Sequence, residues 1–268
     1  MDNKIRICCP CHFGLESVLK YEINKIGGTD LHVTDGKITF SGDFNTIARA
    51  NICLSTAERV LIELGEFEAR TFEELFQGVK AIEFENYIGI NDAFPVKGHS
   101  LNSVLHSVPD CQSIIKKAVV ERLKSKYNVN WFEESNSVVQ IQFSILKDKV
   151  NIYLDTSGIG LHKRGYRKNS NTAPIKETLA AGIIDLARVR SDSIVCDPFC
   201  GSGTILIEAA LKALKIAPGI NRRFAAEKWE CIDKEIWREE RSRAIDLVDR
   251  NAKFEGIGCD IDDFAVAL

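Results

Sequence analysis

Apolar residues near the start of the chain change from strand-like to helix-like spacing and back. An apolar run at 5–9 precedes apolar positions at helical spacing over 15–23. Two short apolar runs, 31–33 and 38–40, then flank Asp35-Gly36, a pair typical of a tight turn. The pattern predicts a strand, a helix and a hairpin.

The middle of the chain continues this mixture of helices and strands. Helical spacing recurs at 45–52 and 73–83, whereas 60–64 and 93–97 have the composition of strands. Residues 113–127 form an amphipathic pattern whose outer face is basic. Two further strands, 138–145 and 150–154, are joined by a hairpin-like turn, so this part predicts an α+β unit.

From residue 174 the pattern becomes that of an α/β protein, in which strands alternate with helices. A helix with proline in its first turn is predicted at 175–187, and it is followed by an apolar strand at 193–196 and a helix at 205–214. A charged helix at about 233–249 leads into a second short strand at 256–260. Both are predicted to be strands of the core sheet of this α/β part.

Length and composition place the chain among ordinary globular proteins of two or three units. It has 268 residues, of which 45% are hydrophobic and 27% charged, and no apolar run reaches the roughly 20 residues of a membrane span. With no secretory signal, we expect a cytoplasmic protein. The net charge of −3 argues against a wholly basic nucleic-acid binder but leaves room for a local basic patch.

The cysteines favour reduced thiols over disulfides or a metal site. Nine cysteines are scattered through apolar segments of a chain that carries no export signal. Cys8, Cys9, Cys11 and His12 lie close together, but no second ligand pair with the spacing of a metal finger occurs elsewhere. We therefore expect no metal.

A glycine-rich turn joins the strand at 193–196 to the helix at 205–214. At such a turn the free backbone N–H groups and the helix dipole attract anionic groups, and Gly201 and Gly203 let a ligand approach without meeting a Cβ. A plain tight turn is the alternative. The turn lacks the third glycine of dinucleotide-binding loops, because position 206 is leucine, and it lacks the Gly-Lys-Ser/Thr of phosphate-binding loops.

The segment from Asp197 to Ala210, which reads Asp-Pro-Phe-Cys-Gly-Ser-Gly-Thr-Ile-Leu-Ile-Glu-Ala-Ala, resembles the cofactor loop of class I RNA and DNA methyltransferases. The resemblance implies that the loop holds the amino-acid end of S-adenosylmethionine and that Asp197 faces its ammonium group. The other residues it assigns to this site are Phe199, Cys200, Gly201, Ser202, Gly203 and Thr204.

A second acidic element follows the next predicted strand. A carboxylate at the end of such a strand can accept hydrogen bonds from both ribose hydroxyls, and the order of elements in the family assigns this role to Asp260, with Asp262 as second choice. The alternative is that both aspartates cap the following helix.

Two segments upstream of the loop resemble the linker and the first helix of the same family. Residues 173–180 place Pro174, Lys176 and Glu177 at the edge of the cofactor pocket, unless they are only a solvated helix start. Residues 160–167 contain four basic side chains suited to RNA phosphates, with a solvated linker as the alternative. They are His162, Lys163, Arg164 and Arg167.

Beside this signature, the front of the chain resembles a THUMP domain, an RNA-binding module. We expect a ferredoxin-like unit at 1–44, the THUMP domain at 45–155, a basic linker at 156–172, and an incomplete Rossmann-like methyltransferase domain at 173–268. The fold class is thus α+β followed by α/β. Side chains suited to RNA contacts, or to an ordinary polar surface, are Lys97, His99, Lys116 and Lys117.

Together with Ala-Pro-Gly-Ile-Asn-Arg at 217–222, these motifs most resemble bacterial enzymes that methylate guanine N2 of large-subunit ribosomal RNA. Transfer RNA guanine-N2 enzymes are close relatives. Older labels for such sequences name DNA adenine-N6 methylation, but the THUMP unit favours structured RNA as partner. The sequence gives no oligomeric state.

The acceptor-binding motif of this family, Asn/Asp-Pro-Pro-Tyr/Phe, is missing from the chain, whose six prolines include no adjacent pair. We therefore expect a partial enzyme that is inactive alone and whose two-stranded sheet exposes apolar faces. A pure RNA-binding module with a residual loop is the rival hypothesis. A THUMP-containing sulfur-transfer enzyme would need a Ser-Gly-Gly-x-Asp-Ser loop, which the sequence lacks.

Overall fold

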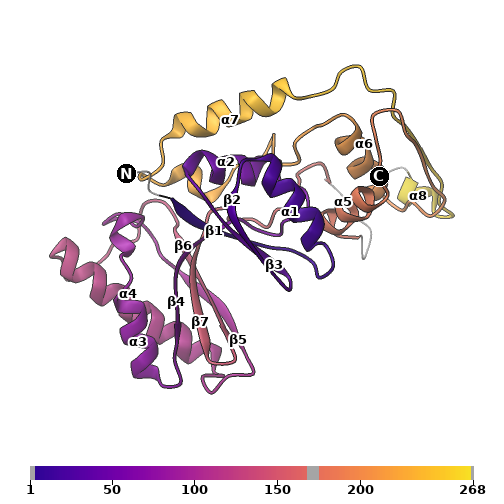
Figure 1. The fold of residues 1–268 in the computed structure, drawn as a ribbon. Helices are drawn as coiled ribbons and strands as arrows, with labels where there is room; N and C mark the ends of the chain where they lie inside the picture. The colour runs from indigo at the N-terminus through magenta and orange to yellow at the C-terminus, as the bar shows by residue number, and fades with distance from the viewer. Residues whose placement is uncertain (1–3, 168–174, 267–268) are drawn as a thin grey trace.

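The computed structural model describes residues 4–167 and 175–266, whose elements follow one another as drawn in Figure 1. The chain opens with a unit in which two helices cover one face of three strands. In chain order its elements are β1 (Ile5–Pro10), α1 (Glu16–Lys25), β2 (Thr29–Thr34), β3 (Lys37–Gly42) and α2 (Phe44–Cys53).

A second unit extends the same sheet rather than forming a new one. Its elements are β4 (Leu61–Glu68), α3 (Phe72–Lys80), a 3-10 turn η1 (Phe84–Asn86), β5 (Val96–Leu101), α4 (Val108–Tyr127), β6 (Gln140–Leu146) and β7 (Lys149–Asp155). The strands form a seven-stranded sheet in the order β2-β3-β1-β4-β7-β6-β5. The boundary expected at residue 44 is therefore not a break in the sheet.

One apolar face of this sheet meets helices from both units. Ile7 and Phe40 in the first unit, and Ile141 and Phe143 in the second, belong to a single buried cluster that also includes residues of α1 to α4. Burial on one face and polar residues on the other follow from the two-residue period of a strand. The two units consequently share one core.

Two element boundaries predicted from the sequence are wrong by several residues. The strand expected at 93–97 begins at Val96, because Pro95 has no N–H to donate and Ala93 makes only an isolated bridge to Val138. Helix α4 begins at Val108 rather than at 113, since Pro109 lies in the first turn, where proline is tolerated.

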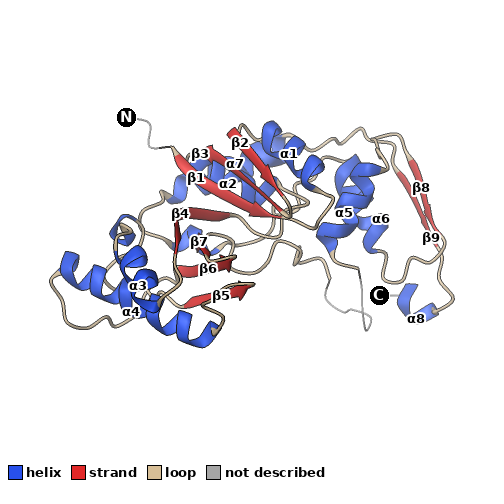
Figure 2. Cartoon of the chain, turned by 60° about the horizontal axis from the view of Figure 1, so that its bottom comes forward, coloured by secondary structure: helices blue, strands red, loops and turns tan. Residues whose placement is uncertain are grey.

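The last part of the chain contains a second, separate sheet. Its elements are α5 (Glu177–Leu186), β8 (Ile194–Asp197), α6 (Thr204–Ala213), a 3-10 turn η2 (Ala225–Lys228), α7 (Lys234–Asp246), β9 (Glu255–Gly258) and α8 (Asp263–Val266). Strands β8 and β9 are parallel, and Figure 2 shows them standing apart from the large sheet. Within the described residues, no helix is both long and apolar enough to cross a membrane.

The two strands predicted for the core sheet of the α/β part, β8 and β9, pair with each other but are largely exposed. Every residue of β9 is exposed, and Ile194 in β8 is 68% exposed. Two strands with helices on one side cannot bury both faces of their sheet. The exposed apolar faces expected from the sequence are therefore confirmed.

The segment between α6 and β9 leaves the small sheet and packs on the first unit. Helix α7 lies along α2 (Figure 1), and the Gly219 N–H donates to the carbonyl of Ile52 over 2.8 Å. A Cβ at Gly219 would stand 2.6 Å from the Asn51 carbonyl, so only glycine fits there. The buried Trp229 indole donates to the Val138 carbonyl over 3.0 Å. This returning segment joins the small sheet to the large one.

Glu85 pairs with two cations of helix α4, Arg122 and Lys126, and these ion pairs make the stability of the second unit depend on pH. Burial alone would raise the pKa of Glu85, but hydrogen bonds from Arg122 and Lys126 outweigh it and hold the pKa at about 2. A carboxyl whose pKa is depressed by folding stabilises the protein above its ordinary pKa, and this contribution is lost as the pH falls toward the folded value.

We therefore predict that the free energy of unfolding of the wild type declines between about pH 4.5 and pH 2 more than that of Glu85→Gln. The measurement is urea unfolding followed by circular dichroism across this range. Glu121→Gln, an exposed change on the same helix α4, is the control and should follow the wild type. Parallel pH profiles for wild type and Glu85→Gln would contradict the assignment.

Candidate functional site

The turn between β8 and α6 adopts the conformation that its glycines predict. Gly201 and Gly203 have φ angles of +53° and +77°, in the left-handed region that residues with a Cβ rarely occupy. A Cβ placed on Gly203 would meet no atom within 4 Å, so the space in front of this residue is open. The backbone here can be approached closely by a ligand.

Hydrogen bonds hold this turn against the end of β9. The Cys200 N–H donates to the Cys259 carbonyl over 2.9 Å, and the Cys259 N–H donates to the Asp197 carbonyl over 2.9 Å. The Gly201 N–H donates to Oδ2 of Asp260 over 2.8 Å. The two acidic residues expected to bind one ligand thus lie at the ends of adjacent parallel strands and border the same turn.

The two aspartates have defined backbone partners. Asp197 Oδ1 accepts from the Phe199 N–H over 3.1 Å, and Asp260 Oδ1 accepts from the Asp262 N–H over 3.0 Å. The hydrogen bonds from the Asp262 and Gly201 amides lower the pKa of Asp260, which keeps it ionised. Since a carboxylate has about four acceptor sites, both groups retain capacity for a ligand.

Asp262 makes the capping contacts that the alternative describes, and its role in ribose binding stays a prediction. Its Oδ1 accepts from the N–H groups of Phe264 and Ala265, at 3.0 and 3.4 Å, at the start of α8. The side chain is therefore used by the helix that follows it.

The N-terminus of α6 faces this turn without a side-chain cap. Its N-cap residue is Gly203, which has no side chain to accept from the first-turn N–H groups, and the first turn contains no acidic residue. These groups and the positive end of the helix dipole are suited to a carboxylate of a ligand.

Behind the turn, one arginine links the starts of α5 and α6. Arg167 Nη1 lies 3.3 Å from Oε1 of the buried Glu177, and its Nη2 donates to the hydroxyl of the buried Thr204. Glu177 and Thr204 therefore lie beside the turn, as predicted. Arg167, predicted to contact RNA phosphates, is instead half-buried and engaged there.

Arg164 is also wrongly assigned to RNA, because it is only 5% exposed. Its guanidinium donates to both carboxylate oxygens of Glu208 on α6, at 3.3 and 3.4 Å, and to the carbonyls of Leu161 and Ser55. Burial raises the pKa of Glu208, whereas Arg164 and the Tyr166 hydroxyl act against this rise. Arg164 thus joins α6 to the linker and to the first unit.

A second cluster forms around Glu58, at the other side of the linker. Two basic groups lie near Glu58 Oε2, namely Lys176 Nζ at 3.5 Å and His162 Nδ1 at 3.7 Å. The other oxygen, Oε1, lies 3.1 Å from His12 Nε2 and also accepts a hydrogen bond from the Thr178 hydroxyl. Burial acts to raise the pKa of Glu58, but the Thr178 hydrogen bond and the neighbouring cations lower it overall.

These contacts correct two further predictions. Lys176 points toward Glu58 rather than to the glycine turn. His162, assigned to RNA phosphates, is half-buried beside Glu58, and burial lowers its pKa. Lys163 remains exposed. Pro174 lies outside the described residues.

The RNA candidates of the second unit do not converge on the glycine turn. Lys97 and His99 are exposed on β5, which forms one edge of the large sheet, and Lys117 is exposed on α4. Lys116 is engaged within the unit, because its Nζ donates to the Phe94 carbonyl over 3.1 Å and to Glu134 over 2.6 Å. Its assignment to RNA stays a prediction.

Sequence reasoning missed the residues that join the units, namely Ser55, Glu58 and Glu208. One signal was available for Glu208, since it is an acidic residue within the otherwise apolar first two turns of α6. Such a residue on a buried helix face needs a cationic partner. No comparable signal marks Ser55, which contributes its carbonyl.

Comparisons with known proteins match all three parts of the chain. Residues 6–61 match the RlmL ferredoxin-like domain, residues 69–155 match the THUMP domain, and residues 164–267 match the RMKL-like methyltransferase domain. A Bacillus subtilis (strain 168) protein named "Putative RNA methyltransferase YpsC" is 45% identical over 269 residues, which cover 99% of this chain and 69% of that protein.

The chain belongs to the THUMP-containing, RlmL-like methyltransferase family. The crystal structure of a "predicted N6-adenine-specific DNA methylase" from Listeria monocytogenes is 44% identical, with a TM-score of 0.95 over 99% of this chain and 70% of that one. SMU.472, "a putative methyltransferase complexed with SAH", is 39% identical, with a TM-score of 0.94 over 100% of this chain and 71% of that one.

Membership of the RlmL-like family confirms the predicted fold class, a ferredoxin-like unit and a THUMP domain followed by part of a methyltransferase domain. The chain spans about 70% of the length of these relatives. Within the family's methyltransferase domain, the glycine turn from Asp197 to Thr204 and the neighbouring Asp260 form the candidate site.

We predict that Arg164→Met destabilises the protein by about 3–5 kcal/mol, because Glu208 is then left buried without its partner. Urea or thermal unfolding measures the change. Lys163→Met, the same substitution at an exposed neighbouring position, should change the stability by less than about 0.5 kcal/mol. Equal changes in stability for the two substitutions would show that the buried Arg164–Glu208 pair stabilises the protein no more than the exposed Lys163 does.

Proposed function

We propose that this chain binds S-adenosylmethionine at the turn between β8 and α6 and serves the methylation of structured RNA. The observation that carries the proposal is the pair of left-handed glycines, Gly201 and Gly203, with open space in front of an uncapped helix N-terminus. Two carboxylates, Asp197 and Asp260, border this space.

The charges around the turn complement those of the ligand. The ammonium group pairs with Asp197, the ligand carboxylate accepts from the first-turn N–H groups of α6, and the ribose hydroxyls donate to Asp260. The crystal structure of SMU.472 is of a complex with SAH, which supports this proposal from a relative that is 39% identical.

The proposed reaction is transfer of a methyl group from the sulfonium to an exocyclic amine, which gives up one proton as S-adenosylhomocysteine forms. Alignment of donor and acceptor supplies most of the rate in such a displacement. This chain contributes the groups that position the donor.

The THUMP domain supports RNA as the acceptor, and we propose guanine N2 of large-subunit ribosomal RNA as the target, with transfer RNA as the alternative. The relative YpsC bears the name of an RNA methyltransferase, which is consistent with this class of acceptor.

We further propose that these 268 residues bind the methyl donor but do not catalyse methyl transfer alone. The reason is that they contain no Pro-Pro pair that could hold the acceptor base. A radiolabelled methyl-transfer assay on ribosomal RNA fragments tests this. No incorporation above background is expected, and turnover by this chain would overturn the proposal.

The cofactor site is tested by calorimetric titration of S-adenosylhomocysteine. Gly203→Val should raise the Kd by about tenfold or more, equal to at least about 1.4 kcal/mol, because its side chain fills the open space in front of α6. Gly14→Val is the matched control, since Gly14 also has a positive φ, +88°, with no atom within 4 Å of a Cβ.

The control should bind as the wild type does, although both substitutions place a side chain on a left-handed backbone. Absence of binding by the wild type at millimolar ligand would instead favour the rival hypothesis, an RNA-binding module in which the turn is only a folded remnant.

A further inference from the structure

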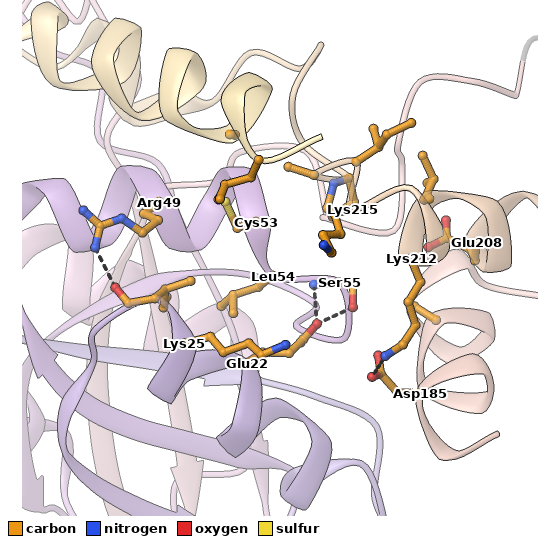
Figure 3. A pocket seen from close by; sticks show the side chains of 18 of the residues that line it. Glu22, Lys25, Arg49, Cys53, Leu54, Ser55, Asp185, Glu208, Lys212 and Lys215 are labelled. Atoms are coloured by element: carbon orange, nitrogen blue, oxygen red, sulfur yellow. Dashed lines mark hydrogen bonds and ion pairs between the residues drawn. The ribbon is translucent and has the colours of Figure 1, made fainter. Parts of the chain in front are cut away.

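A second hollow lies between the first unit and the methyltransferase part, and the residues of the glycine turn do not line it. Its walls are α1, the end of α2, α5, α6, the turn that follows α6, and α7 (Figure 3). Its volume is about 330 Å³. We call it the α1–α7 cleft.

The acidic residues of the α1–α7 cleft are all engaged by neighbours. Glu22 alone accepts four hydrogen bonds, from the amides and hydroxyls of two consecutive residues. The pairings are Glu22 with Ser55 and Thr56, Asp185 with Lys212, Glu208 with Arg164, and Glu240 with Arg49. These carboxylates therefore have hydrogen-bond partners, and three of the four are paired with a cation.

The rim, in contrast, carries three exposed cations, two of which have no carboxylate partner. Lys25, Lys215 and Arg243 come from α1, from the turn after α6 and from α7. In the described part of the chain, no carboxylate oxygen lies within 4.0 Å of Lys25 or Arg243. Lys215 has one partner, the Asp249 carboxylate at 3.3 Å. The rim is therefore suited to an anion.

The floor of the α1–α7 cleft is apolar. It includes the buried Leu54, together with Leu211 on α6 and Ile216 in the turn after it. At the edge, Tyr21 is 56% exposed and lies under Lys25 Nζ, which stands 4.3 Å from its ring centroid. An aromatic ring, an apolar floor and several cations are the combination that binds single-stranded nucleic acid, in which bases stack and phosphates pair with cations.

We infer that the α1–α7 cleft binds an unpaired nucleotide of the RNA, with its phosphate at Lys25, Lys215 and Arg243 and its base between Tyr21 and the apolar floor. The inference rests on the proposed function, in which RNA is the acceptor. It adds a second RNA-binding surface, distinct from the site of methyl transfer. The cleft is built from both the ferredoxin-like unit and the methyltransferase part, so it would also fix their common orientation on the RNA.

The test compares two fluorescent RNAs, a blunt hairpin and the same hairpin with a single-stranded 3′ tail, by fluorescence anisotropy. The wild type should bind the tailed RNA more tightly. The double variant Lys25→Glu/Arg243→Glu should bind the tailed RNA about tenfold or more weakly and lose most of the preference for the tail. The slope of its affinity against salt should become shallower by about 0.7 for each phosphate that the variant no longer neutralises.

The matched control is Lys20→Glu/Arg250→Glu, which makes the same charge change at exposed residues that do not line the α1–α7 cleft. Equal losses of affinity in the two double variants, or equal wild-type affinity for the two RNAs, would overturn the inference and leave the proposed function standing. If the wild type binds neither RNA, both the inference and the proposed function are contradicted.

A crosslinking measurement identifies the occupant directly. With 4-thiouridine in the 3′ tail, irradiation should attach the RNA to peptides that contain Tyr21 or residues 211–218. Crosslinks confined to β5 would contradict the inference.

Discussion

The buried guanidinium of Arg164 is the contact on which the arrangement of this protein depends. It bonds at once to Glu208 on α6, to the linker carbonyl of Leu161 and to the Ser55 carbonyl of the first unit. A buried arginine is tolerated only when its donors are satisfied, so the three groups must keep their relative positions. Because α6 begins at the glycine turn, the turn is held in place relative to the linker and the first unit.

Two other groups of contacts act with Arg164 to hold the parts of the fold together. The Glu58 cluster fixes the start of α5, and the segment from Gly219 through α7 returns over α2, where Arg49 and Glu240 form a bidentate pair. Together they explain how a small two-stranded sheet with exposed faces keeps a defined place in the fold. Its own strands bury little, so its position depends on contacts with the shared core.

The sequence was sufficient where the chemistry is local. Gly201 and Gly203 predict a left-handed turn, and the order of strand, turn and helix predicts its place at a sheet end. It failed where the decisive partner is distant along the chain. Arg164 and Arg167 look like solvated cations until Glu208 and Glu177 are seen beside them. The capping contacts of Asp262, which are local, could be named from the sequence as an alternative.

The central claim is that Arg164 holds the glycine turn, and hydrogen–deuterium exchange of the unliganded protein tests it most directly. In Arg164→Met, the backbone amides of residues 201–207 should exchange faster than in the wild type, whereas Lys163→Met should leave them unchanged. The amides of the buried strand β6 serve as the internal reference, because a purely global loss of stability would speed their exchange as well as that of the turn. Unaltered exchange at 201–207 in Arg164→Met would contradict the account.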